Sequence, residues 1–279
     1  MKPVLVTLHA HPDDEAIFTG GTIVRAVESG WRVVLIMATD GDRGRAPGLF
    51  RSGLRAHRRS ETLAAASVLG VERVEFLGYG DSGYDDPSGS SPNSRIATAR
   101  GLRSGTLAAV HIDEAAATVR RILAEEDAVA LTCYDDNGIY GHIDHVQVHE
   151  IAWRSVEGLS CELYESTLDR SALRRLRNEL LERGLAPDRW PLALAERLGV
   201  ENGPGIVTVD VSDQLERKLV AVAAHSSQVI QATTFMGLPA GVFHHLLRTE
   251  WFRVGRRGRG QVLEMLRAID EVVRRPVAI

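Results

Sequence analysis

The sequence has 279 residues, of which 44% are hydrophobic and 25% are charged, and its formal net charge is −4. These proportions are typical of a globular protein with a large core, and they exclude a chain that is disordered throughout. The small net charge argues against a dedicated nucleic-acid binder, and no apolar run reaches the roughly 18 residues that a membrane span needs.

Short apolar runs alternate with helical patterns over the first 165 residues. The runs predict strands at 3–8, 33–38, 74–77 and 129–133, and we expect the first two to be buried. The segments between them predict helices from about 17 to a stop at Gly30, and at 54–69 and 113–125. Because strands that alternate with helices form parallel sheets, the pattern predicts an α/β fold. Gly20 and Gly21 would let the first helix lie close to the sheet.

The rest of the chain departs from this rhythm. Residues 84–105 are rich in Ser, Gly, Pro and Arg and predict a long surface loop, while 253–260 predict a basic, exposed turn. We expect an edge strand at 162–167, a further strand at 206–211, and helices at 172–185, 192–198 and from a cap at 212–213 to about 224. No linker interrupts the chain. We therefore expect one domain, 1–279, with a core at 1–165 and a C-terminal helical and strand elaboration at 166–279.

Two polar clusters follow strands of the predicted sheet. A His-x-Asp-Asp cluster at 11–14 comes directly after the first strand, and a His-x-Asp-His cluster at 142–145 follows the loop after the 129–133 strand. Each cluster opens a helix. In open parallel sheets, ligands bind beyond the carboxyl ends of the strands, where the strand order reverses. Both clusters are therefore expected to meet at one edge of the sheet.

The residue types in these clusters favour a metal. Three His or Asp ligands with one open position are the pattern of catalytic zinc, and the same donors suit Fe²⁺. No cysteine is present in either cluster, which disfavours a closed structural site. The clusters also hold a spare carboxylate, which could act as a general base on a water activated by the metal.

Single residues in this region have structural alternatives. The acidic run at 13–15 could simply stabilise the N-terminus of a helix. We expect His9 to be structural, because alternation along the strand points it away from His11, and we expect His149 on a helix surface. Two clusters at two strand-to-helix junctions still favour the metal site.

The clusters belong to longer motifs, AHPDDE at 10–15 and YGHIDH at 140–145. These motifs resemble those of the PIG-L and LmbE-like family of zinc-dependent N-acetylglucosaminyl deacetylases. Arg58-Arg59-Ser60-Glu61 looks like the family's Arg-x-x-Glu helix. Gly80-Asp81-Ser82-Gly83 is similar to a segment of the mycothiol branch, which contains a deacetylase of a GlcNAc-inositol and an amidase of mycothiol conjugates. The resemblance covers mainly 1–165 and implies a Rossmann-like, mostly parallel sheet flanked by helices.

The resemblance also implies a role for each matching residue. The metal ligands would be His11, Asp14 and His145, which would hold Zn²⁺ or another divalent ion such as Fe²⁺. Asp13 would be the general base.

The remaining matches would act on the substrate. Tyr140 and a protonated His142 would stabilise the oxyanion and assist the leaving amine, and Asp144 would orient or tune His142. Arg58 and Asp81 would hold polar groups of the substrate.

Three functions remain open at this point. The first is metal-dependent hydrolysis of the amide of an N-acyl amino sugar, such as an N-acetylglucosaminyl conjugate, to a free amine and a carboxylate. The second is a mycothiol-type S-conjugate amidase. The third is a non-catalytic nucleotide-binding module, which the absence of Gly-x-Gly-x-x-Gly in the first turn disfavours. Asp42 stands where many relatives have Glu, which leaves the substrate open.

The two cysteines, Cys133 and Cys161, cannot form a disulfide scaffold, and the opening residues are too short for a secretion signal. We therefore expect a cytoplasmic enzyme that acts on a small amino-sugar substrate, with no nucleic-acid or membrane partner.

Overall fold

The computed structural model describes residues 2–44, 46, 50, 52–83, 103–184, 196, 198–228, 244–256 and 262. A seven-stranded sheet forms the centre, in the order β3-β2-β1-β4-β5-β7-β6. Its strands are β1 (Val4–His9), β2 (Arg32–Thr39), β3 (Arg73–Tyr79), β4 (Ala130–Tyr134), β5 (Glu162–Thr167), β6 (Ile206–Asp210) and β7 (Thr249–Val254). The first five are parallel, and β6 and β7 are antiparallel. The predicted α/β fold with a mostly parallel sheet is confirmed.

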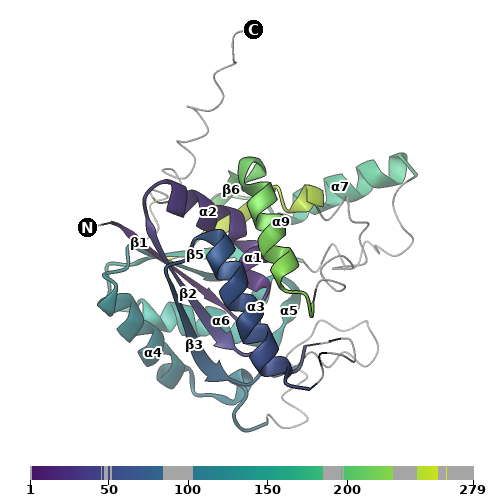
Figure 1. Ribbon diagram of the computed structural model, residues 1–279. Coiled ribbons are helices and arrows are strands. Elements are labelled where there is room, and N and C mark those ends of the chain that lie inside the picture. Colours follow the sequence, from purple (N-terminus) through teal and green to yellow (C-terminus); the bar gives the residue numbers. More distant parts are fainter. Residues whose placement is uncertain are drawn as a thin grey trace.

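Helices cover both faces of this sheet (Figure 1). They are α1 (Asp14–Phe18), α2 (Gly20–Glu28), α3 (Leu54–Leu69), α4 (Ile112–Glu125), α5 (Gly138–Gly141), α6 (Ile143–Ser155), α7 (Arg170–Glu182) and α9 (Leu215–Ala224). One core joins the sheet to α4 and α6, and a second joins it to α2, α3 and α9. Because both faces are covered, β1 and β4 are buried along their whole length and consist mainly of apolar residues. Within the described ranges, every helix is too short or too polar to cross a bilayer.

The strand order reverses between β1 and β4. The chain goes from β1 to β2 on one side, and β4 pairs with the other side of β1. The loops that leave the carboxyl ends of these two strands therefore diverge, and they leave a crevice of the kind that binds ligands in open α/β sheets. Both predicted clusters leave the sheet at this crevice.

Several sequence-based expectations need correction. The strand at 162–167 is not an edge strand, because β5 pairs with β4 on one side and with β7 on the other. Within the expected basic turn at 253–260, Arg253 and Val254 end β7, and 257–260 lie outside the described residues. Most of the expected loop at 84–105 and helix at 192–198 also lie outside them. The first helix is two helices, which meet at Thr19.

The two glycines at the start of α2 lie against the C-terminal part of the chain. A Cβ atom on Gly21 would lie 2.3 Å from the Cβ of Val211, and one on Gly20 would lie 3.2 Å from the Lys218 side chain. Glycine is needed at position 21 because Val211, the residue directly after β6, lies too close to α2 for any side chain there. Val211 directly follows β6, so Gly21 brings α2 close to the end of a strand of the sheet, as expected, whereas Gly20 lies against α9.

A buried ion pair also links the C-terminal strands to α2. Lys218 Nζ lies 2.6 Å from Glu250 Oε1, and neither side chain is more than 1% exposed. Glu250 also accepts hydrogen bonds from the amides of Gly21 and Thr22, in the first turn of α2. One carboxylate on β7 therefore stabilises the N-terminus of α2 and neutralises the ammonium group on α9.

We expect Lys218→Met to lower the free energy of unfolding by about 3–5 kcal/mol, because Glu250 would remain as a buried charge without a cation. The measurement is urea unfolding of the purified protein. Adding Glu250→Gln to Lys218→Met removes that charge and should restore part of the loss. A single variant as stable as the wild type would show that the ion pair makes no net contribution.

Candidate active site

The loops after β1 and β4 bring three candidate ligand atoms together. Nδ1 of His11 lies 3.3 Å from Nε2 of His145. Oδ2 of Asp14 lies 3.4 Å from the first nitrogen and 3.3 Å from the second. All three side chains are at most 9% exposed. The two clusters, some 130 positions apart in the sequence, meet at the crevice as the strand-end argument predicted.

This triangle of atoms has the dimensions of a metal site. An ion bound at about 2.0–2.1 Å in tetrahedral geometry keeps its ligand atoms about 3.4 Å apart. The observed separations of 3.3–3.4 Å match that spacing. His142 lies close enough to His11 and His145 to belong to the same group of possible ligands. Two imidazole nitrogens and a carboxylate oxygen suit Zn²⁺ or Fe²⁺.

Charges around the triangle favour the ionised carboxylate. Burial raises the pKa of Asp14, but His145 and His11 outweigh burial and hold this pKa well below its usual value. Asp14 is therefore ionised at neutral pH, which a metal ligand requires.

The carboxylate of Asp144 supports His11. Its Oδ2 lies 3.1 Å from Nε2 of His11 and accepts a hydrogen bond of 2.9 Å from the amide of Ser82. Burial raises the pKa of Asp144, but His11 outweighs it and lowers the value to about 2. The sequence expectation assigned Asp144 to His142. The structure directs Oδ2 of this carboxylate to the ring nitrogen of His11 that faces away from the triangle, while burial lowers the pKa of His142 and the Asp144 charge only partly offsets that lowering.

Asp13 lies beside the triangle in an uncommon backbone conformation. Its φ angle is 110°, in the region that side-chain-bearing residues rarely adopt. Its carboxylate is 22% exposed and lies 3.2 Å from Nη2 of Arg58. Burial raises the pKa of Asp13 to about 7, and Arg58 opposes this increase. A carboxyl group with that pKa can accept a proton near neutral pH, as a general base must.

Glu15 and His225 hold the backbone at Asp13. Oε2 of Glu15 accepts a hydrogen bond from the Asp13 amide, and Oε1 lies 2.6 Å from Nε2 of His225. Both residues are buried. The acidic run is therefore more than a set of exposed first-turn charges.

Tyr140 and His142 come from α5 and from the residue that starts α6. The hydroxyl of Tyr140 lies 3.3 Å from Nε2 of His145, and this side chain is part-exposed. Nδ1 of His142 accepts a hydrogen bond from the Asp144 amide, which caps α6 and leaves the proton of the neutral ring on Nε2. Burial and the neighbouring His11 hold the pKa of His142 well below its usual value. The protonated His142 expected from the resemblance is therefore not the favoured state of the free protein.

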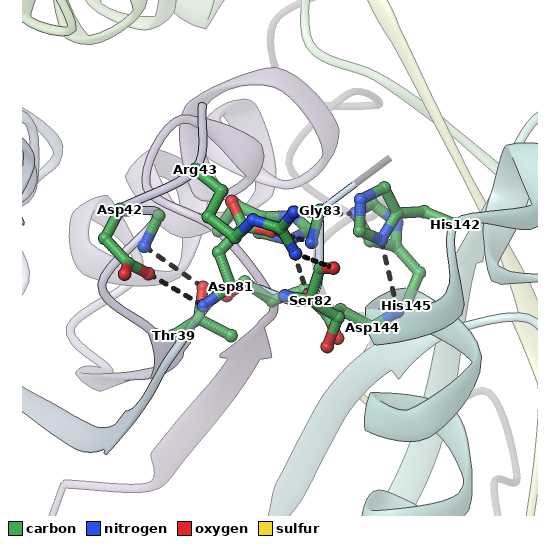
Figure 2. A network of polar contacts seen from close by, with 12 residues as sticks. Thr39, Asp42, Arg43, Asp81, Ser82, Gly83, His142, Asp144 and His145 are labelled. Atoms are coloured by element: carbon green, nitrogen blue, oxygen red, sulfur yellow. Dashed lines mark hydrogen bonds and ion pairs between the residues drawn. The ribbon is translucent and has the colours of Figure 1, made fainter. Parts of the chain in front are cut away.

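The loops after β2 and β3 form the other side of the site (Figure 2). Asp42 accepts a hydrogen bond of 2.9 Å from the amide of Asp81, and Arg43 donates one of 2.5 Å to the carbonyl of Ser82. Asp81 Oδ1 accepts from the Gly83 amide and lies 3.7 Å from Nε2 of His11. This places Asp81 against the ligand group.

The side chain of Arg58 forms its hydrogen bonds with other residues of this protein. Its guanidinium donates to the carbonyls of Gly41 and Pro12 and to Asp13, and it is 3% exposed. These contacts describe a residue that holds the base and its loop, and its expected role in substrate binding stays a prediction.

Two further histidines near the site lie on the same two segments. His9 is buried, with its ring nitrogens 3.2 Å from the hydroxyl of Tyr134 and 2.9 Å from that of Thr19, as expected for a structural residue. The expectation that His149 lies on a helix surface is wrong. It is buried, and its Nδ1 donates to the carbonyl of Tyr134. Two faces of α6 are covered, because the helix packs against both α4 and β4.

We expect Arg58→Met to move the acidic limb of the activity–pH profile upward by about one pH unit or more. The base must be deprotonated, and removing the nearby positive charge raises the pKa of Asp13. The measurement is kcat/KM against pH at saturating metal. Arg59→Met is the matched control, because Arg59 follows directly on the same helix and pairs with Asp40 instead. An unchanged limb in Arg58→Met would mean that Asp13 is not the group that titrates.

A His–Asp ligand group, a neighbouring carboxylate with a pKa near neutral and divergent loops at the strand-order reversal are together the features of a hydrolytic enzyme. A family model described as PIG-L: GlcNAc-PI de-N-acetylase matches residues 6–156. The chain belongs to this family.

Curated relatives extend the match over most of the chain. A 1D-myo-inositol 2-acetamido-2-deoxy-alpha-D-glucopyranoside deacetylase of Rhodococcus erythropolis is 32% identical over 252 residues, which cover 82% of each protein. The deacetylase of the same name from Actinosynnema mirum is 33% identical over 237 residues, with 81% of each covered. The chain is thus an enzyme of the deacetylase type, and the alternative of a non-catalytic nucleotide-binding module is not supported.

Solved structures share the fold. The N,N'-diacetylchitobiose deacetylase of Pyrococcus horikoshii superposes with a TM-score of 0.54 at 21% identity, over 90% of this chain and 83% of that one. A deacetylase from the teicoplanin biosynthesis pathway gives 0.58 at 16% identity, over 91% and 99%.

Proposed function

We propose that this enzyme hydrolyses the acetamido group of an N-acetylglucosaminyl conjugate and releases a free amine and acetate. The observation that carries the proposal is the triangle of His11, Asp14 and His145, whose ligand atoms lie 3.3–3.4 Å apart beside Asp13. The names of the curated relatives support an N-acetylglucosaminyl-inositol as the first substrate to test. The bound ion would be Zn²⁺, with Fe²⁺ as the alternative.

The three ligands would hold the ion, which supplies a Lewis acid and an activated water when it is bound. Asp13 takes the proton from the attacking water. Its carboxylate is 22% exposed and is held by Arg58. The amide of Asp13 is fixed by Glu15, so the base keeps one orientation although its backbone conformation is uncommon.

Tyr140 and His142 stabilise the oxyanion that forms on the substrate carbonyl. The Tyr140 hydroxyl and the Nε2–H of a neutral His142 are both donors, and Tyr140 borders the ligand group directly. One such donor is worth about 10²–10³ in rate. Because His142 is neutral in the free enzyme, we assign the return of the proton to the leaving amine to Asp13, which holds it after the first step.

The test is an amine-release screen of the metal-loaded enzyme over N-acyl amino sugars. Zinc and iron are compared under anaerobic conditions. Turnover of N-acetylglucosaminyl-inositol is the expected result. Turnover confined to bulky thiol conjugates would assign the enzyme to the S-conjugate amidases instead. Release of no amine from any substrate, with metal bound, would contradict the proposal.

We also propose a domain organisation and a cellular location for this protein. We propose one domain over 1–279, because β6 and β7 from the C-terminal part continue the sheet of the first part. We propose the cytoplasm as its location, because Cys133 and Cys161 are free, buried thiols. The substrate would be a small amino sugar, with neither nucleic acid nor a membrane as a partner.

A further inference from the structure

Tyr134, the last residue of β4, is fully buried and lies against the candidate ligands. Its hydroxyl donates a hydrogen bond of 2.8 Å to Oδ2 of Asp14. Its ring is stacked on the imidazole of His145, with the ring centroids 4.1 Å apart and an angle of 12° between the planes. No step of the proposed reaction uses this side chain, yet it contacts two of the three ligands.

The surroundings of the hydroxyl direct its proton to Asp14. The amide of Ala10 donates to the same oxygen at 2.9 Å, so the oxygen already accepts one hydrogen bond. Nδ1 of His9, at 3.2 Å, is the other group that could accept the hydroxyl proton, but the Asp14 carboxylate is nearer, at 2.8 Å, and charged, so it is the stronger acceptor. Tyr134 therefore holds the oxygen of Asp14 that faces the two histidines, together with the His11 amide, which donates to the same oxygen at 2.9 Å.

The ring of Tyr134 contacts His145 by stacking and not by a hydrogen bond. Metal-binding histidines usually donate their second ring N–H to a polar group, which fixes the ring. His11 follows this rule, because its Nε2 faces Asp144. Nδ1 of His145 is buried and has no hydrogen-bond partner among the described residues. The orientation of this ring is thus set by packing, and the face of Tyr134 is the surface that lies parallel to it.

We propose that Tyr134 is the positioning residue of the metal site, which holds Asp14 through its hydroxyl and His145 through its ring. This inference rests on the proposed function, since it assumes that these residues bind a divalent ion. Tyr134, at the end of β4, would then support both Asp14 and His145. The residue acts on metal affinity and takes no part in the proton transfers proposed above.

The test is a zinc titration of the metal-free, full-length protein in competition with a chromophoric chelator. Tyr134→Phe keeps the ring and removes the hydroxyl, and we expect the Kd for zinc to rise by about 10–100-fold. Tyr134→Leu removes both contacts, and we expect a larger increase. Tyr164→Phe is the matched control, because Tyr164 is a buried tyrosine on the next strand whose hydroxyl donates to Glu162. Its Kd should equal that of the wild type.

Two readouts separate positioning from a general loss of stability. A lower melting temperature of metal-free Tyr134→Phe with an unchanged Kd would overturn the inference. At saturating zinc, we expect most of the kcat of Tyr134→Phe to return, because the reacting groups are intact. A kcat that stays low although zinc is bound would also overturn the inference.

A further measurement does not depend on changing Tyr134. In Tyr140→Phe protein labelled with 3-fluorotyrosine, a buried tyrosine resonance should shift when zinc is added, since only Tyr134 among the described tyrosines then contacts the ligand group. No shift on zinc binding would contradict the inference. A wild-type protein that binds no zinc would instead contradict the proposed function, so the two failures are distinguishable.

Discussion

Asp13→Asn is expected to lower kcat by about 10²–10⁴-fold while zinc stays bound, because the variant loses the group that takes the proton from water. Asparagine has nearly the same shape as aspartate and tolerates the φ angle of 110° at this position. The change therefore removes basicity and leaves the loop in place. The measurement combines steady-state kinetics with metal analysis of the same preparation.

Asp127→Asn is the matched control for this variant. Asp127 also has a positive φ angle, of 47°, and lies exposed after α4, away from the site. The same substitution in the same class of backbone conformation should leave kcat unchanged. If Asp13→Asn lost zinc together with activity, Asp13 would act as a ligand and a different group would be the base.

His145→Ala is expected to raise the Kd for zinc by more than about 100-fold, because loss of a supporting residue alone typically costs 10–100-fold. His145 contributes one corner of the triangle, 3.3 Å from both other ligand atoms. Activity should fall in parallel at limiting zinc and should recover in part when zinc is raised. The measurement is competitive titration, with metal content after gel filtration.

His149→Ala is the control, because His149 lies one turn further along α6 and is buried as well. Its hydrogen bond is to the backbone carbonyl of Tyr134, not to the hydroxyl or the stacked ring, and it belongs to no ligand group of the described residues. Zinc affinity should therefore hold while stability falls. Equal zinc content in His145→Ala and the wild type would rule out the ligand set proposed here.

Local patterns in the sequence were enough to place the site on the fold. Buried apolar runs such as β1 and β4 need no distant information, because a strand covered on both faces must be apolar along its length. The polar residues that follow each run must then leave the sheet at its carboxyl edge. Convergence of His11 and His145 follows from that geometry once the strands are known to be neighbours.

Pairings between side chains could not be predicted in the same way. Asp144 was assigned to its sequence neighbour His142, yet its carboxylate meets His11, which is 133 positions away. Glu15 reaches His225 over 210 positions. Such contacts depend on how loops from separate strands pack together, and neither hydrophobic periodicity nor a sequence motif predicts that packing.

The sequence by itself determined the fold class, the ligand types and the edge of the sheet at which they lie, because period, burial and residue chemistry are local properties. Tertiary structure decided that β5 is an inner strand, that Gly21 of α2 lies against Val211 and that Tyr134 lies against Asp14 and His145. Each of these depends on a distant segment of the chain, namely β7, the end of β6 or the loop after β1. The free energy of such contacts comes from atoms that only the folded chain brings within reach.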